Sequence, residues 1–284
     1  MTKAERLRRL STPDGVIAAM AIDQRKSLRM MIAAAAGVPV EAISDEQLGE
    51  FKRVVVHHLS PYASAVLIDP EFGGPAIGAQ SDTCGLLLTY EMDGYENPRP
   101  NRMLALMPNW SVRRLVDAGA QGIKILLSWT PFDDPEPNNH KRALIERIGA
   151  ECEANDVPFF LEPVGWDPKT NLDVKGLEYA RMKPEIVIRT MQEFSDPRYR
   201  VDVLKVEFPV NSSFLGSAYS RLEALDYYRK ADEAVGNIPY IYLSAGVSTA
   251  QFTEQLSLAA EAEARFSGVL CGRATWQGGV PAYA

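Results

Sequence analysis

Two lysines and two carboxylates are the residues of this sequence whose types and spacing could do chemistry. Lys205 lies in the apolar run VDVLKVEFPV, and Lys124 lies in GIKILLSW. Glu162 in PFFLEPV and Asp23 at the end of GVIAAMAID belong to two further apolar runs. A buried lysine is costly unless it is paired or neutral. A neutral amine can attack a ketone or aldehyde and form a Schiff base, because only the unprotonated form is nucleophilic.

Alternation along a strand predicts which way these side chains point. Lys205 shares one strand face with Val203 and Glu207, while the apolar residues between them face the other way. We expect the apolar face to meet helices, which turns Lys205 inward. The same alternation gives two more inward pairs: Lys124 with Leu126, and Glu162 with Phe160. Such a cluster can depress the pKa of one amine; the alternative is a buried Lys–Glu ion pair with a structural role.

A second set of residues could bind an anion. The segment LSAGVS contains Ser244 and Gly246, and the segment LCGRATW contains Gly272 and Arg273. Glycine N–H groups and a helix N-terminus can hold a phosphate, and an arginine adds two charged donors. We therefore expect a phosphate site here. The alternative is a structural arginine at the rim of the fold.

Composition limits the partners and the location. The 284 residues are 46% hydrophobic and 24% charged, as in an ordinary globular protein. The formal charge of −7 argues against a nucleic-acid surface. The three cysteines form no CxxC pair, the N-terminus has no secretory signal, and no apolar run is long enough to span a bilayer. We therefore expect a cytoplasmic protein without a membrane partner.

Metal chemistry has little support in the sequence. The histidines are His57, His58 and His140, and the first two are adjacent in a predicted helix, so they cannot face one ion together. The cysteines have no histidine at metal-ligand spacing. We expect no metal site.

The elements that must position these side chains follow a regular pattern. Short apolar runs alternate with amphipathic stretches, which predicts parallel βαβ units. Eight such units predict a (β/α)8 TIM barrel, here one domain over 1–284. The alternative is an open doubly wound sheet, although no GxGxxG follows the first run. The eight expected strands lie at 15–23, 64–70, 85–91, 122–129, 158–164, 201–210, 239–246 and 266–276.

The pattern also predicts helices, loops and one gap. We expect a short N-terminal helical extension, and loops at 93–108 and 131–139 that could shape the site. After the last strand only 277–284 remain, too few for a final helix, so the last helix of the barrel is expected to be missing from the chain. Five further helices are expected at 47–62, 109–120, 140–156, 221–235 and 249–264.

Several segments resemble class I, Schiff-base tagatose-1,6-bisphosphate aldolases, a family that in its wider sense includes sulfofructose phosphate aldolases. They are AIDQR, SPYASAVLIDPEFG, DVPFFLE, FSDPR, VDVLKVEFPVN, PYIYLSAGVS and GVLCGRATW, and together they cover most of the chain. The resemblance implies reversible cleavage of a ketose bisphosphate, such as D-tagatose 1,6-bisphosphate. The products would be dihydroxyacetone phosphate and glyceraldehyde 3-phosphate. It also implies that no metal or other cofactor takes part and that the chain forms a homo-oligomer.

The same resemblance implies a role for each site residue. Lys205 would form the imine with the ketose carbonyl, and Glu162 would shuttle protons during its formation and hydrolysis. Lys124 would hold substrate hydroxyls and help to depress the pKa of Lys205. Asp23 would orient or deprotonate the hydroxyl next to the breaking bond. The phosphate on the ketone fragment is assigned to Ser244, Gly246, Gly272 and Arg273, and the far phosphate to Gln24 and Arg25.

Two departures from the family pattern concern the far end of the substrate. Lys26 follows AIDQR in place of a small residue, and PVGWDPKTN replaces an aliphatic stretch after the fifth run. Two alternatives stay open, and the departures bear on the first of them. One is a sulfofructose 1-phosphate aldolase, which would keep Lys205 and change the distal pocket. The other is a non-catalytic barrel that senses a metabolite, which would not need the lysine and its partners.

Overall fold

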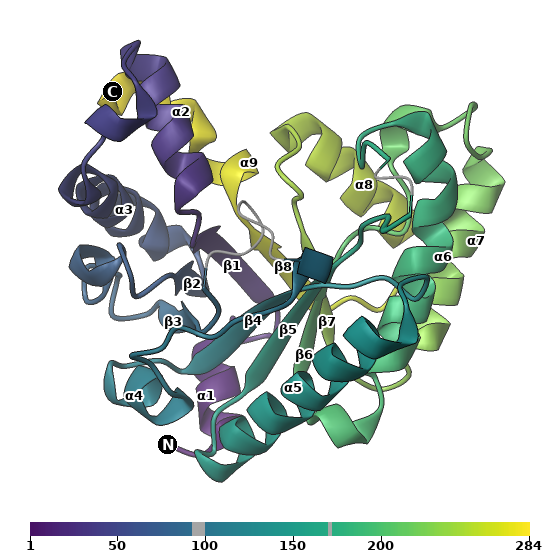
Figure 1. The fold of residues 1–284 in the computed structure, drawn as a ribbon, viewed down its shortest axis with the longest axis horizontal. Coiled ribbons are helices and arrows are strands. Elements are labelled where there is room, and N and C mark those ends of the chain that lie inside the picture. Colours follow the sequence, from purple (N-terminus) through teal and green to yellow (C-terminus); the bar gives the residue numbers. More distant parts are fainter. Residues whose placement is uncertain (93–99, 170–171) are drawn as a thin grey trace.

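Eight parallel strands form a closed barrel in this computed structural model, which describes residues 1–92, 100–169 and 172–284 (Figure 1). The strands follow chain order, and the barrel closes where the first pairs with the last, with Met20 opposite Cys271. The predicted (β/α)8 barrel is confirmed, and the open sheet is wrong. The strands are β1 (Ile17–Ile22), β2 (Ala65–Ile68), β3 (Gly85–Thr89), β4 (Gly122–Ser128), β5 (Phe159–Val164), β6 (Val203–Val206), β7 (Tyr240–Leu243) and β8 (Gly268–Cys271).

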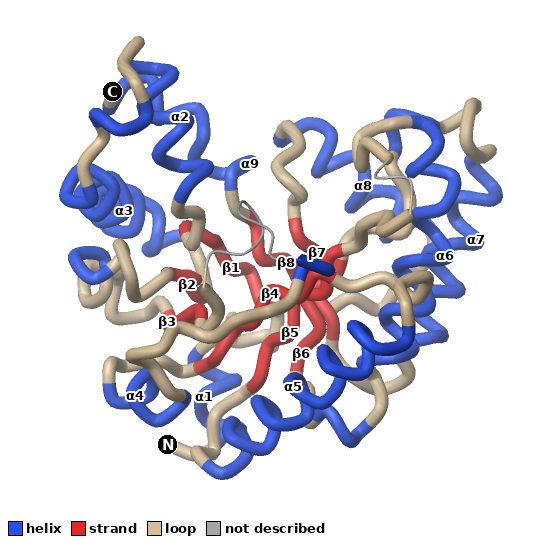
Figure 2. Tube along the Cα trace, viewed as in Figure 1, coloured by secondary structure: helices blue, strands red, loops and turns tan. Residues whose placement is uncertain are grey.

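Helices surround the strands, so that the strands form the centre of the molecule (Figure 2). The helices between β1 and β8 are α2 (Lys26–Ala36), α3 (Asp45–Leu59), α4 (Val112–Asp117), α5 (Pro135–Ala154), α6 (Leu177–Phe194), α7 (Arg221–Ala234) and α8 (Thr249–Glu261). All five predicted helices are found, and α2 and α6 are additional. The loop expected at 131–139 is shorter than predicted because α5 already begins at Pro135. Of the loop expected at 93–108, residues 93–99 lie outside the described residues. No helix in the described ranges is long and apolar enough to cross a membrane.

The N-terminal helical extension is α1 (Lys3–Arg9), and it covers the end of the barrel where the strands begin. Leu10, which follows it, is completely buried in the cluster of side chains inside the barrel. Two strand-starting glycines leave it room: a Cβ at Gly85 would lie 2.5 Å from the Arg9 carbonyl oxygen, and one at Gly122 would lie 3.0 Å from Leu10 Cδ1. Leu10 therefore completes the apolar packing at this end of the barrel interior.

The seam between β8 and β1 is covered differently from the other strands. Within residues 172–284, β8 is followed by two four-residue helices, α9 (Arg273–Trp276) and α10 (Val280–Tyr283), and by no long helix. The rings of Trp276 and Tyr283 instead pack edge-on against Phe51 of α3, with centroids 5.7 and 5.0 Å away. Trp276 Nε1 also donates to the Ala21 carbonyl of β1 at 2.8 Å. These last residues lie beside α2 and α3 in Figure 1.

The alternation along the strands sorts side chains as predicted. Phe160 and Val203 belong to the cluster inside the barrel, whereas Leu204 and Val206 pack in the layer between strands and helices. Lys205 therefore points inward from β6. Seven short 3₁₀ segments complete the described structure: η1 (Val40–Ala42), η2 (Ser60–Tyr62), η3 (Gly74–Ala76), η4 (Pro100–Arg102), η5 (Pro197–Tyr199), η6 (Ser212–Phe214) and η7 (Gln277–Gly279).

Candidate active site

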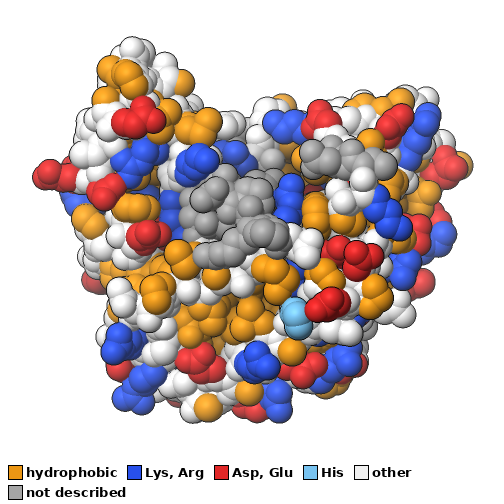
Figure 3. All heavy atoms as spheres, in the orientation of Figure 1, with side chains coloured by type: hydrophobic (Ala, Val, Ile, Leu, Met, Phe, Trp, Pro, Cys, Tyr) orange, Lys and Arg blue, Asp and Glu red, His pale blue; other side chains and the backbone are white. Residues whose placement is uncertain are grey.

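A cavity of about 720 Å³ opens at the C-terminal ends of the strands. In a barrel of parallel strands this end carries the chemistry, because the loops after the strands converge there. The space-filling view shows this face, with lysine and arginine side chains around the atoms that are not described (Figure 3). Every site residue predicted from the sequence lines the cavity: Asp23, Gln24, Arg25, Lys124, Glu162, Lys205, Ser244, Gly246, Gly272 and Arg273.

Lys124 is the hub of the site. Its ammonium group lies 2.9 Å from Asp23 Oδ2, 2.9 Å from Glu91 Oε1 and 2.8 Å from Glu162 Oε2. Burial alone would lower the pKa of Lys124, but the three carboxylates outweigh burial and hold the pKa well above its ordinary value. Lys124 is therefore a fixed cation, so Lys205 is the inward lysine that remains as the candidate nucleophile.

Glu162 joins the two inward lysines. Its Oε1 lies 2.7 Å from Lys205 Nζ, while its Oε2 contacts Lys124. Both amines are almost completely buried. The carboxylate is thus in position to take a proton from, or return one to, the Lys205 amine and groups attached to it, because proton transfer needs direct hydrogen-bond contact.

Asp23 lies just beyond β1 and faces the same cavity. Burial would raise the pKa of its carboxyl group, but the positive charges of Lys124 and Lys205 outweigh burial and hold the pKa well below its usual range. Asp23 is therefore ionised, with one oxygen on Lys124. Its other oxygen accepts a hydrogen bond from Gln24 Nε2 at 3.3 Å.

Glu91 is a site residue that the sequence reasoning missed. It follows β3 and supplies the third carboxylate around Lys124. Its signal was present: the apolar run 85–91 ends on this glutamate, at the strand end where barrel sites are built.

The expected anion site is assembled at the ends of β7 and β8. The Gly272 N–H donates to Ser244 Oγ at 3.3 Å, which joins the two loops. The Arg273 guanidinium lies over Gly246, where a Cβ would be 2.5 Å from Nη2, and Gly246 has a φ of +71°. Only glycine fits that backbone shape with so close a neighbour. Among the described residues Arg273 has no ion-pair partner, so its charge remains available.

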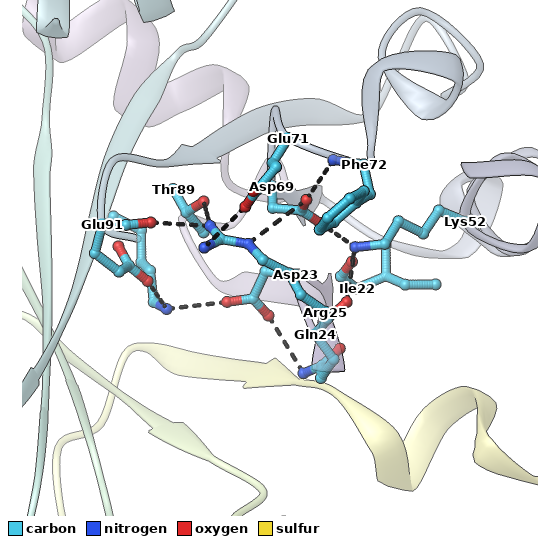
Figure 4. A network of polar contacts seen from close by, with 11 residues as sticks. Ile22, Asp23, Gln24, Arg25, Lys52, Asp69, Glu71, Phe72, Thr89 and Glu91 are labelled. Carbon is cyan, nitrogen blue, oxygen red and sulfur yellow. Dashed lines mark hydrogen bonds and ion pairs between the residues drawn. The ribbon is translucent and has the colours of Figure 1, made fainter. Parts of the chain in front are cut away.

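Gln24 and Arg25 point to different places. Gln24 Nε2 lies 3.1 Å from the position of a Cβ on Gly272, next to the anion site. Arg25 is 5% exposed, and its Nη2 donates to Thr89 Oγ1 and to the Glu91 carbonyl, both at 2.9 Å (Figure 4). The guanidinium is thus bound at the C-terminal end of β3 and lies at the cavity wall. That these two residues approach a far phosphate stays a prediction.

Within the described ranges, no group of three or more histidine, cysteine, aspartate or glutamate side chains is arranged to hold a metal ion. His57 and His58 are exposed neighbours near the end of α3, and His140 is exposed on α5. The three cysteines are free thiols.

Comparison with known proteins identifies the family of this chain. A model of the DeoC/LacD family aldolases matches residues 17–278. The chain belongs to the DeoC/LacD aldolase family. Tagatose 1,6-diphosphate aldolase 2 of Enterococcus faecalis is 48% identical to this aldolase, over 96% of this chain and 82% of that protein. Tagatose 1,6-diphosphate aldolase of Streptococcus pneumoniae is 45% identical over 99% of this chain and 86% of that protein.

Solved structures support the fold of this aldolase. An archaeal fructose 1,6-bisphosphate aldolase superimposes with a TM-score of 0.64 and covers 96% of this chain and 92% of its own. Its sequence identity is 16%, so the likeness concerns the barrel and not the details of the site. A fructose-bisphosphate aldolase from Slackia heliotrinireducens gives a TM-score of 0.65 at 12% identity and covers 98% of this chain and 82% of its own.

Proposed function

We propose that this aldolase is a class I enzyme that reversibly cleaves D-tagatose 1,6-bisphosphate to dihydroxyacetone phosphate and glyceraldehyde 3-phosphate. The observation that carries the proposal is the buried pair of Lys205 and Glu162 at 2.7 Å, next to the fixed cation Lys124. The names of the relatives in Enterococcus and Streptococcus favour tagatose bisphosphate as the substrate.

The reaction begins with imine formation. The Lys205 amine adds to the ketone carbon C2, and Glu162 moves protons so that the carbonyl oxygen leaves as water. The product is a protonated imine on Lys205. This cation withdraws electrons from the neighbouring carbon–carbon bond, which is the chemical purpose of a Schiff base.

Bond cleavage then uses Asp23. Its carboxylate removes the proton of the C4 hydroxyl, the C3–C4 bond breaks, and C4 becomes the aldehyde of glyceraldehyde 3-phosphate. The electron pair of the broken bond becomes the C2–C3 double bond of an enamine on Lys205. Protonation at C3 restores the imine, and water releases dihydroxyacetone phosphate and the free amine. The pKa of Asp23 is held low, so the carboxyl group is ionised before the substrate binds.

The phosphate of the ketone fragment would lie on four residues, Ser244, Gly246, Gly272 and Arg273. Backbone N–H groups and a guanidinium that has no ion-pair partner among the described residues suit a dianion, and binding there would orient C2 toward Lys205. Because the imine serves as the electron sink, this mechanism needs no metal or other cofactor. The small-molecule partner is a sugar phosphate. A homo-oligomeric state and a cytoplasmic location stay predictions.

The test is a cleavage assay with three substrates. We expect release of dihydroxyacetone phosphate from tagatose 1,6-bisphosphate, and also from its C4 epimer fructose 1,6-bisphosphate, with much slower turnover of sulfofructose 1-phosphate. Preference for the sulfo-sugar would replace the proposed substrate with that alternative. No cleavage of any of the three, with binding retained, would support the metabolite-sensing barrel instead.

A further inference from the structure

A buried ionic network stands behind the wall of the cavity, on the side of β1, β2 and β3. We propose that Lys52, acting through Asp69 and Arg25, is a positioning residue that fixes Asp23 and Glu91 around Lys124 for the bond-cleavage step. The inference rests on the proposed class I mechanism. Lys52 and Asp69 do not line the cavity and touch no substrate in this account.

Lys52 holds the end of β1 from outside the barrel. It projects from α3, its side chain is 0% exposed, and its ammonium donates to the carbonyls of Ile22 and Gln24 at 3.0 and 2.8 Å (Figure 4). These two carbonyls flank Asp23. The position of the Asp23 backbone is therefore fixed on both sides by one buried cation.

Asp69 connects Lys52 to the end of β2. One oxygen pairs with Lys52, and the other accepts the Phe72 N–H at 2.8 Å and lies 3.6 Å from Arg25 Nε. The turn that follows is tight: a Cβ on Gly73 would lie 2.2 Å from the Asp69 carbonyl oxygen. Because Asp69 is completely buried, these partners must compensate its negative charge.

Arg25 carries the network on to β3. Besides Asp69, its guanidinium contacts Thr89 Oγ1 and the Glu91 carbonyl at 2.9 Å each, and Nη1 lies 3.6 Å from Glu71. The same two loops, after β1 and β3, carry the Asp23 and Glu91 carboxylates that hold Lys124. The network thus fixes two of the three carboxylates around Lys124.

Stability alone does not account for so many buried charges. Replacing a buried ion pair by apolar residues is often neutral or stabilising, because desolvation cancels much of the attraction. What apolar side chains cannot do is hold backbone carbonyls in fixed directions. Displacing a reacting group by about 1 Å can cost about 100-fold in rate, so accurate placement of Asp23 is worth the cost.

This arrangement makes the network selective for one chemical step. Imine formation depends on Lys205 and Glu162, which come from β6 and β5 on the other side of the barrel. Cleavage of the C3–C4 bond depends on Asp23. Loosening the β1 end should therefore slow cleavage and leave imine formation nearly unchanged.

The experiment compares the two steps in Lys52→Met, which keeps an unbranched chain and removes the ammonium. Imine formation is followed by rapid-quench borohydride trapping with dihydroxyacetone phosphate, and cleavage by single turnover of tagatose 1,6-bisphosphate. A second variant, Lys52→Met with Asp69→Asn, removes both charges and serves if the single variant does not fold. The matched control is Lys141→Met, a completely buried lysine on α5 that pairs with Asp133 at 3.3 Å and does not line the cavity.

We expect the Lys52 variants to lose about 100-fold in cleavage rate while imine formation changes by less than about threefold. Lys141→Met should leave both rates unchanged, even if it unfolds at a lower temperature. Equal losses in both steps, no loss in either, or the same pattern in the control would overturn the proposal. If the wild-type protein forms no adduct on Lys205, the class I mechanism itself fails, which is a separate and earlier result.

Discussion

The two ends of the barrel interior use the same strands for opposite purposes. Toward the N-terminal ends the inward side chains are apolar and buried, with Leu10, Phe160 and Val203 among them. Toward the C-terminal ends the inward side chains are charged, and Lys205 and Glu162 form an ion pair. The two environments are two residues apart along a strand. Phe160 lies two residues before Glu162, and Val203 lies two residues before Lys205.

The difference shows how one fold provides stability and reactivity side by side. The apolar end excludes water and gives the charged end a floor of low polarity, where ion pairs and hydrogen bonds are stronger than in water. The charged end would be costly to bury alone, and its carboxylates and amines compensate one another around Lys124. Substitutions at the apolar end should therefore change stability, and substitutions at the charged end should change the reaction.

The largest effect should come from Lys205→Met. We expect activity to fall by at least about 10⁴-fold, because the proposed mechanism forms the imine on Lys205. The unfolding temperature should change little, since Glu162 keeps its contact with Lys124. Cleavage assays and thermal unfolding measure both. The control is Lys230→Met on the exposed face of α7, which should keep full activity. A Lys205 variant that remains active would contradict the assignment of the reaction to the charged end.

Glu162→Gln should have the next largest effect. The amide can still hydrogen-bond to Lys205 but cannot accept a proton, so the rate of imine formation should fall by about 10²–10⁴-fold. Borohydride trapping over time with dihydroxyacetone phosphate measures this rate. Glu185→Gln, at an exposed position of α6, is the matched control and should behave as wild type. Unchanged trapping would assign the proton transfers to another group.

At the apolar end, Phe160→Ala should act on stability. Removing a completely buried aromatic ring typically costs about 3–5 kcal/mol in the free energy of unfolding, which urea titration measures. At temperatures where the variant is folded, the rate of imine formation should stay within about tenfold of wild type. A large kinetic defect with normal stability would show that the two ends are not separate in function.

The smallest effect concerns pH. The pKa of Asp23 is lower in the folded protein than its ordinary value of about 3.9. Its ionisation therefore stabilises the fold above about pH 4, and this contribution is lost as pH falls further through the folded pKa. The stability difference between wild type and Asp23→Asn, measured by urea titration, should shrink between about pH 5 and pH 3. A difference that grows toward acid pH would contradict the charge arrangement around Lys124.

Much of the fold could be read from the sequence because each strand is a short apolar run between amphipathic segments. All eight strands lie within the predicted ranges. α6 was missed because Pro184 interrupts its pattern, whereas α2 was within reach of the same reasoning, because Leu28 and Ile32 recur at helical spacing and are buried. The last helix of the barrel was expected to be missing, and the sequence did not indicate that Trp276 and Tyr283 pack on Phe51 at this seam.

The site could be predicted where a charged residue interrupts an apolar strand, as with Lys124 and Lys205. Glu91 was within reach of the same reasoning. Lys52 was not, because it lies in a helix whose other charged residues are ordinary surface residues, and only the folded chain brings it to the Ile22 and Gln24 carbonyls. The direction of Arg25 was equally hidden, since its partners Thr89 and Glu91 are more than 60 residues away.

The most direct test of this account is to locate the covalent adduct. The protein would be incubated with dihydroxyacetone phosphate, reduced with borohydride, digested, and analysed by peptide mass spectrometry. We predict a single reduced adduct on Lys205 and none on Lys124, which its three carboxylates keep protonated. An adduct on Lys124, or no adduct at all, would contradict the assignment of the two inward lysines and the class I mechanism built on it.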